Sequence, residues 1–223
     1  MATRAQRTER RTDALSKERI IEAAIEILDA DGEGALTFRA LTARLSTGAG
    51  AIYWHIANKN ELLAATTNDV IARVMSDVVS DAEPRESIRA IALGVFDAID
   101  AHPWVGTQLS REPWQSAMPQ IFEGIGGRLQ ALGVPEQAQF DSASALLNYV
   151  LGVAGQNAAN ARLHAHVTDR AEFLGSVAAQ WTQLDPAEYP FVHQVAAQLS
   201  EHDDREQFLA GIDLFLAGIG TVR

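Results

Sequence analysis

The chain has 223 residues, of which 47% are hydrophobic and 21% charged, and its formal net charge is −11 at pH 7. This length is enough for a small domain and a larger one with its own buried core. The acidic excess argues against a protein that wraps nucleic acid along its whole length, because like charges repel the phosphate backbone. The absence of cysteine excludes disulfides, thiolate zinc sites, cysteine nucleophiles and thiol-based redox sensing.

The charge is unevenly distributed along the chain. Residues 1–62 hold nine Lys and Arg against nine Asp and Glu, so the remaining residues carry the whole negative excess. A neutral head and an acidic body would orient the molecule so that only the head approaches a duplex. The N-terminal residues lack an apolar signal core, and no later stretch approaches the roughly 20 apolar residues of a membrane span. We therefore expect a cytoplasmic protein with no membrane segment.

The first 15 residues carry four arginines, at positions 4, 7, 10 and 11. Two readings stay open for this segment. It is either a basic arm that lies along the DNA backbone or in the minor groove, or a disordered terminus that only aids solubility.

The first expected helix covers residues 16–30, where apolar side chains recur at helical spacing. Ser16 is its expected N-cap. Gly32 and Gly34 follow its end, where a chain leaving a helix often needs a positive φ, and Thr37 offers a cap for the next helix. The helix supplies an apolar face that shorter neighbours need in order to be stable.

Two short helices are expected between Thr37 and Lys59. An apolar face formed by Phe38, Leu41 and Leu45 is interrupted by a Ser-Thr-Gly turn and resumes at residues 51–56. Together with the first helix they form a three-helix unit whose last member fits the major groove of DNA. A fourth helix begins near Asn58, which is the expected cap, with Glu61 reaching back.

The motifs in this region resemble those of the tetracycline-repressor (TetR) family of bacterial transcription regulators. The resemblance is carried by two runs, ALTFRALTARL and AIYWHIANKNELL, of which YWH-x-x-NK-x-x-LL is the most specific part. Weaker similarity to the family's C-terminal domain follows in AHPW, ALLNYVLGVA and FLAGIDLFLAGI. The chain departs from the family pattern at Ser46, Thr47 and Gly48, where the family usually has a glycine, an aliphatic residue and a capping side chain.

The resemblance implies an all-α fold with a helix-turn-helix DNA-binding domain at residues 16–62, preceded by the basic arm at 1–15. A helical ligand-binding and dimerisation domain follows at 63–223. No cofactor and no metal site is expected.

The expected DNA-binding residues follow the positions of the family motif and belong to the three-helix unit, except for Lys59, which lies in the first turn of the fourth helix. Polar or charged tips can reach phosphates or base edges, and residues with little side chain allow close approach to the groove floor. For Arg39 the alternative is a solvated surface charge, and for Tyr53 it is a packed core aromatic. An exposed Trp54 is expected, because its neighbours occupy the core side. The residues are Thr37, Arg39, Gly48, Ala49, Gly50, Tyr53, Trp54, His55 and Lys59.

The body is expected to be helical, with breaks at its prolines and no sustained alternating pattern of strands. A helix over about 141–163 carries stripes of small residues, and a last helix over about 204–220 carries a seam of bulky ones. Paired with their twofold copies, they would form a four-helix dimer interface, unless both simply pack within one chain. The interface residues are Ala145, Gly152, Gly155, Ala159, Phe208, Ile212, Phe215 and Ile219.

A small-molecule pocket is expected in the body, where bulky residues and turns gather over residues 102–122 and polar groups project from the long helix. The alternative for each residue is ordinary core or surface. The pocket residues are His102, Trp104, Trp114, Met118, Phe122, Asn148, Tyr149 and Gln156.

The leading hypothesis is a homodimeric, ligand-responsive transcription regulator, most simply a repressor released from a palindromic double-stranded DNA operator by a small-molecule inducer. The other is an all-α enzyme or small-molecule carrier that does not bind DNA. Against the enzyme, no nucleophile, base and orienting acid form a recognisable set. The sequence leaves the ligand, the operator and the direction of regulation open.

Overall fold

The computed structural model describes residues 15–78, 82–111, 117–163, 170–199 and 201–220. These residues form helices and connecting turns without any strand, which confirms the all-α fold. In chain order the helices are α2 (Lys17–Asp31), α3 (Phe38–Leu45), α4 (Ala49–Tyr53), α5 (Lys59–Asp77), α6 (Pro84–Ala101), α7 (Pro103–Arg111), α8 (Met118–Ala131), α9 (Glu136–Leu163), α10 (Arg170–Trp181), α11 (Pro190–Leu199) and α12 (Asp204–Ile219). The arginines of the expected basic arm lie outside the described residues.

Side-chain caps define where the helices of the head begin. Ser16, Thr37 and Asn58 each accept a hydrogen bond from the backbone N–H three residues later, at 3.3, 3.1 and 2.9 Å. The Glu61 carboxylate reaches back and accepts from the backbone N–H of Ala57 at 2.8 Å. All three predicted caps are therefore confirmed, and the reciprocal contact at the start of α5 lies one residue earlier than the standard capping box.

The three helices of the head share a small core. Ile20 and Ala24 of α2, Leu41 of α3 and Ile52 of α4 are fully buried, as is Ile56 just after α4. These side chains come from three elements that are each too short to be stable alone, so their common burial holds the head together.

The turn between α3 and α4 is closed by backbone groups. Ser46 has φ 50° and ψ 45°, the left-handed conformation, which few residues other than glycine adopt readily. The N–H groups of Ser46 and Thr47 both donate to the carbonyl of Thr42. Gly48 then begins α4 without a side-chain cap. The departure from the family pattern therefore preserves the turn, at the expense of a strained serine.

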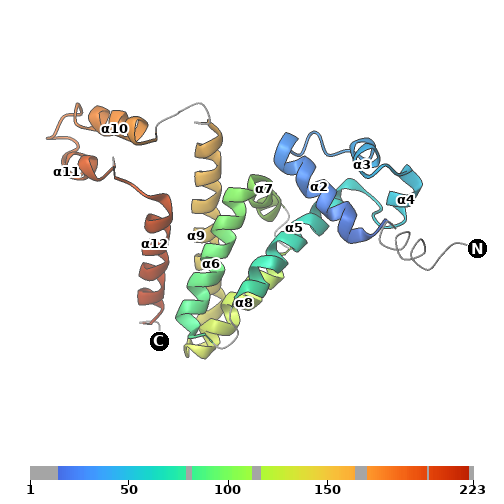
Figure 1. Ribbon diagram of the computed structural model, residues 1–223. Coiled ribbons are helices and arrows are strands. Elements are labelled where there is room, and N and C mark those ends of the chain that lie inside the picture. The colour runs from blue at the N-terminus through green and yellow to red at the C-terminus, as the bar shows by residue number, and fades with distance from the viewer. Residues whose placement is uncertain (1–14, 79–81, 112–116, 164–169, 200, 221–223) are drawn as a thin grey trace, which may run out of the picture.

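Helix α5 joins the head to the body, and the predicted boundary after residue 62 falls inside it. Leu62 and Leu63 are buried near its beginning, and Val70 and Ile71 are buried further along. Figure 1 shows α5 running from the three-helix head to the bundle formed by α6, α8 and α9. The two parts are thus connected by a continuous helix rather than by a flexible linker.

Four of the described helices of the body have proline as their first or second residue. Pro84, Pro103 and Pro190 are the first residues of α6, α7 and α11, and Pro119 is the second residue of α8. Proline fits the first turn of a helix, because N–H groups in that turn have no acceptor within the helix and the N–H that proline lacks is not needed there. The predicted breaks at these prolines are confirmed as helix starts.

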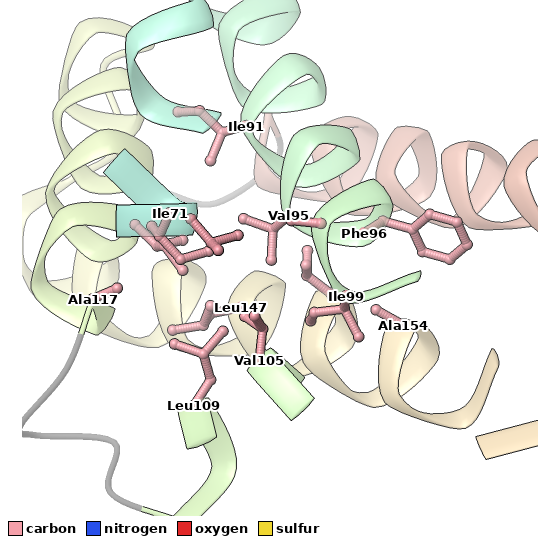
Figure 2. Close-up of a cluster of buried hydrophobic side chains, with 14 of the residues drawn as sticks. Ile71, Ile91, Val95, Phe96, Ile99, Val105, Leu109, Ala117, Leu147 and Ala154 are labelled. Atoms are coloured by element: carbon pink, nitrogen blue, oxygen red, sulfur yellow. The ribbon is translucent and has the colours of Figure 1, made fainter. Parts of the chain in front are cut away.

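The core of the body lies between α5, α6, α7 and α9. Ile71, Val95, Ile99 and Leu147 are at most 4% exposed, and Figure 2 shows them converging with Leu109 of α7. This core fixes α7 against the bundle, so the other face of α7 is available to contact the head.

Helix α12 packs against α6 and α9 of the same chain. Arg85 donates to the carbonyl of Leu216 at 3.0 Å, and Arg205 pairs with Asp97 at 3.1 Å. A further ion pair joins Arg89 of α6 to Asp213 of α12. These contacts fasten the last helix to α6, and Figure 1 shows α12 running beside α9 and α6.

A close approach between α9 and α12 centres on Tyr149. Its ring stacks on Phe208 at a centroid distance of 5.7 Å, and its hydroxyl donates to the Phe208 carbonyl at 3.1 Å. Burial raises the pKa of the Tyr149 phenol, so the group stays a hydrogen-bond donor over a wide pH range. The ring lies where a side chain on Gly211 would stand. Glycine at this position therefore allows the tyrosine to bridge the two helices.

Ser46→Gly is expected to raise the free energy of unfolding by about 0.5 kcal/mol. Relief of the left-handed strain contributes about 1–2 kcal/mol, and the greater freedom of glycine in the unfolded chain offsets part of it. Urea unfolding measures the change. Ser176→Gly, at an exposed position inside α10, is the control and should lower stability; an equal change in both variants would contradict the strained conformation of Ser46.

Gly211→Ala is expected to lower the free energy of unfolding by about 1–3 kcal/mol, because the added methyl group displaces the Tyr149 ring. Gly127→Ala is the matched control. Gly127 lies in α8 with open space around it, so alanine there should raise stability by about 0.5–1 kcal/mol through helix propensity. Thermal unfolding compares them, and stabilisation by both substitutions would rule out the close approach.

Candidate DNA-binding surface and effector cavity

Helix α4 presents backbone and small side chains to the surface. Gly48, Ala49, Gly50 and Ala51 are all exposed, and only Ile52 of the helix is buried. A helix with so little side chain on its outer face can approach the floor of a groove closely, with methyl groups for thymine contacts. The predicted recognition residues thus lie together at the beginning of one exposed helix.

Aromatic side chains mark the other end of α4. The Tyr53 ring stacks on Phe38 of α3, with centroids 4.4 Å apart and planes 8° apart, and 53% of Tyr53 remains exposed. Trp54 is 86% exposed, which confirms the prediction from the helical pattern. His55 is partly buried beside them. The stack fixes the end of α4 against the beginning of α3, and the indole projects into solvent.

The remaining polar candidates come from α3 and α5. The Thr37 hydroxyl accepts the N–H of Ala40, so its first role is to cap α3, and Arg39 is exposed in the first turn. The Lys59 ammonium donates to the backbone carbonyl of Glu33 at 2.6 Å. An ammonium group has three donors, so this bond leaves Lys59 able to contact phosphate as well.

A cavity of about 480 Å³ lies between the beginning of α8 and the first half of α9. It brings together three residues predicted for the pocket, Met118, Phe122 and Asn148. The volume and the mostly apolar wall with a few polar groups are typical of a small-molecule site. The complete lining is Met118, Pro119, Phe122, Phe140, Ser144, Leu147 and Asn148.

Sequence reasoning missed three residues that α9 contributes to this lining beside the predicted Asn148, namely Phe140, Ser144 and Leu147. All four residues follow the spacing of one helical face, and Phe140 lies before residue 141, where the helix was expected to begin. Phe140 is 62% exposed, and its ring lies 5.9 Å from that of Phe122. Extending the helical pattern back to Pro135 would have included Phe140, and the face that it shares with Asn148 would have pointed to Ser144 and Leu147.

The structure corrects the prediction for two of the pocket aromatics. His102 Nδ1 lies 2.8 Å from the Asp29 carboxylate, and Trp104 Nε1 donates to the same oxygen at 2.7 Å. Both residues therefore lie at the contact between head and body instead of lining the cavity beside Met118. His102 also lines a separate cavity of about 410 Å³, whose wall comes mainly from α5 and α6. Their carboxylate partner is distant in sequence, so local spacing could not reveal the contact. Trp114 lies outside the described residues.

Two other pocket predictions are also displaced. Tyr149 faces α12, where it contacts Phe208 and Phe215, rather than the cavity between α8 and α9. Gln156 lines a separate cavity of about 580 Å³ bounded by α9, α10, Leu199 of α11 and the beginning of α12. The long helix turns different residues toward different neighbours, which its apolar pattern alone does not distinguish.

The predicted interface residues divide into two groups. Ala145, Gly152 and Ala159 are exposed and Gly155 is partly buried, so the small-residue stripe of α9 lies largely on the surface of one chain. The bulky seam of α12, in contrast, lies mostly in the interior of the chain. Phe208, Ile212 and Ile219 are buried within the chain, and Phe215 is half-buried against Tyr149. The prediction that Phe208, Ile212 and Ile219 face a partner is therefore corrected, because α12 turns them toward the core of its own chain, whereas the half-buried Phe215 keeps part of its surface exposed.

Within the described parts of the chain, His, Asp and Glu residues form no group of three that could hold a metal ion. The same parts contain no helix that is both long and apolar enough to cross a bilayer.

Two family models match this architecture. Residues 20–66 match the model of the bacterial regulatory proteins of the tetR family, and residues 81–223 match that of the tetracyclin repressor-like C-terminal domain. A regulator from Saccharopolyspora erythraea, an HTH-type transcriptional regulator, is 30% identical over 152 residues. That match covers 67% of this chain and 64% of the relative, so it spans less than two thirds of the relative's length.

Solved structures share the fold over nearly the whole chain. The transcriptional regulator SCO7222 of Streptomyces coelicolor, a TetR, is 52% identical with a TM-score of 0.86, covering 93% of this chain and 99% of its own. BioQ with its double-stranded DNA operator is 26% identical with a TM-score of 0.63, covering 93% and 99%. Members of the family are DNA-binding regulators and not enzymes. The chain belongs to the TetR family of bacterial transcriptional regulators.

Proposed function

We propose that the protein is a homodimeric repressor that binds a palindromic double-stranded DNA operator and is released from it by a small-molecule inducer. Each subunit places α4 in the major groove, and the two helices occupy successive grooves about 34–36 Å apart. The observation that carries the proposal is the exposure of Trp54 and Tyr53 at the end of a helix whose other exposed residues are glycine and alanine.

The surface around α4 has the chemistry that a duplex requires. Small residues allow close approach to the bases, whereas Tyr53, His55 and Lys59 supply donors for phosphate oxygens. Arg39 is the long cation nearest to the beginning of α3 and has the geometry for guanine. BioQ, a relative in fold, was solved with its DNA operator, which supports the same role for the equivalent head here.

Exposed small residues on α9 support a dimer. A stripe of Ala145, Gly152 and Ala159 lets a second helix approach closely, and Leu214 on the outer face of α12 is 75% exposed. A twofold copy would cover both helices with the same two helices of its own. The interface proposed from the structure therefore uses the outer face of α12 in place of the predicted seam.

The cavity between α8 and α9 is the proposed effector site. Its wall is mainly apolar, with Ser144 and Asn148 available for hydrogen bonds. A largely apolar molecule with one or two polar groups fits this wall. A ligand shifts operator occupancy only by its differential affinity for two conformations, about 5.5 kcal/mol for a complete swing. Repression is the simplest outcome of operator binding, because a protein that occupies a promoter is enough to block it. Such a regulator acts in the cytoplasm, where the chromosome is.

Trp54→Ala is expected to weaken operator binding at least tenfold, since a large exposed contact is lost from the protein–DNA interface. Tyr189→Ala, which removes an exposed aromatic from the body, is the control and should leave affinity unchanged. Gel-shift titration against DNA flanking the protein's own gene measures both. Equal affinities for the two variants would remove the Trp54 surface from the proposal.

Lys59→Ala is expected to lower operator affinity and to reduce the slope of log K against log salt by about 1, the value for one lost phosphate contact. Fluorescence anisotropy of labelled operator at several salt concentrations gives the slope. An unchanged slope would mean that Lys59 serves only its bond to Glu33.

Gly152→Glu is expected to convert the dimer into folded monomers. Gly152 is exposed and a Cβ there meets no other atom within 4 Å in one chain, but in the dimer a glutamate at this position would be buried against its copy. Gly127→Glu, on the exposed side of α8, is the matched control. Sedimentation velocity reads the mass of each variant, and a dimeric Gly152→Glu protein would exclude the α9 stripe from the interface.

A further inference from the structure

Carboxylates at the end of α2 connect the head to the body. Asp29 accepts hydrogen bonds from Trp104 Nε1 at 2.7 Å and from His102 Nδ1 at 2.8 Å. Trp104 is 4% exposed and His102 is the residue between α6 and α7, so both partners are held by the body. The indole N–H can only donate a hydrogen bond, and a carboxylate is a strong acceptor for it.

Glu33 makes a second connection in the turn after α2. Its carboxylate accepts from Gln108 at 3.1 Å and from Arg111 at 2.8 Å, one turn further along α7. Its backbone carbonyl accepts from the Lys59 ammonium at 2.6 Å. A single residue therefore joins α7 of the body to the lysine at the beginning of α5.

Another carboxylate of α2 makes a different contact. Glu26, three residues before Asp29, pairs with Arg44 of α3 at 2.5 Å. This pair lies wholly inside the head. Removing Glu26 or Asp29 changes the charge of the head equally, but only Asp29 contacts the body.

The geometry of these contacts determines where the head can stand. Asp29 and Glu33 lie at one end of α2, and their partners are spaced along α7, whose opposite face is packed in the body core through Val105 and Leu109 (Figure 2). Head and body are thus fixed by two contacts in addition to α5. A dimer must hold its two α4 helices at the spacing of successive major grooves. If either head can move relative to the body, DNA binding has to order that head, and this entropic cost lowers the affinity.

We propose that Asp29 and Glu33 are positioning residues for DNA binding, because their carboxylates hold the head against the body at α7. The inference rests on the proposed function of the head. Electrostatics makes it testable, since a carboxylate near DNA repels phosphate and its simple removal should strengthen binding. A positioning role predicts the opposite sign.

The experiment compares Asp29→Ala, Glu33→Ala and Glu26→Ala in the full-length protein, at one salt concentration, by titration of the operator. Glu26→Ala should bind as tightly as the wild type or slightly more tightly. Asp29→Ala and Glu33→Ala should each bind about tenfold more weakly, the size expected for a lost hydrogen bond to a charged group. Equal affinities for all three variants would overturn the proposal.

A partner variant tests the contact itself. Trp104→Phe keeps a ring in the core and removes the N–H donor, so it should weaken binding alone but add little to Asp29→Ala in a double-mutant cycle. Additive losses would show that the two residues act separately and would overturn the pairing.

Hydrogen exchange distinguishes a misplaced head from an unfolded one. In Asp29→Ala, amides at the end of α2 should exchange faster while those of α6 and α9 stay protected; uniform loss of protection would mean general destabilisation and would overturn the positioning role. If the wild type binds no operator DNA, the proposed function fails and this role with it. If the wild type binds and the Asp29 and Glu33 variants match it, only the positioning role fails.

Discussion

Helix α4 has five residues, too few to be stable by itself, so its position depends on burial of Ile52 and on the stack between Tyr53 and Phe38. The remainder of the head serves this arrangement. Helices α2 and α3 provide the core that receives Ile52, and a backbone-closed turn at Ser46 sets the angle between α3 and α4. These contacts hold α4 through its buried side. Its exposed residues at 49–51 are therefore not needed to keep the helix in place and can be alanine and glycine.

Helix α5 carries that arrangement to the rest of the molecule. Its first turns belong to the core of the head and its later turns to the core of the body, so the two parts share one rigid element. The two parts nevertheless differ in charge, since the net negative charge lies entirely in the body. A duplex is therefore approached by the neutral head, while the acidic body is kept away from phosphate.

Local features of this structure could be predicted from the sequence, because each depends on residues close together in the chain. The caps at Ser16, Thr37 and Asn58 and the exposure of Trp54 follow from spacing within one or two turns. Contacts over long separations could not. The bond between Asp29 and Trp104 spans 75 residues, and periodicity identifies an apolar face on α12 without saying whether its own chain or a copy covers it. Because spacing along the chain does not show which distant element a side chain contacts, only some of the residues predicted for the cavity line it.

The position of Phe140 has a thermodynamic consequence. Its ring stands at the rim of the cavity between α8 and α9, with most of its surface in contact with water. A molecule that fills the space beneath it would withdraw this aromatic surface, together with its own, from the solvent. Such an association lowers the heat capacity, and its enthalpy becomes more favourable as the solution is warmed.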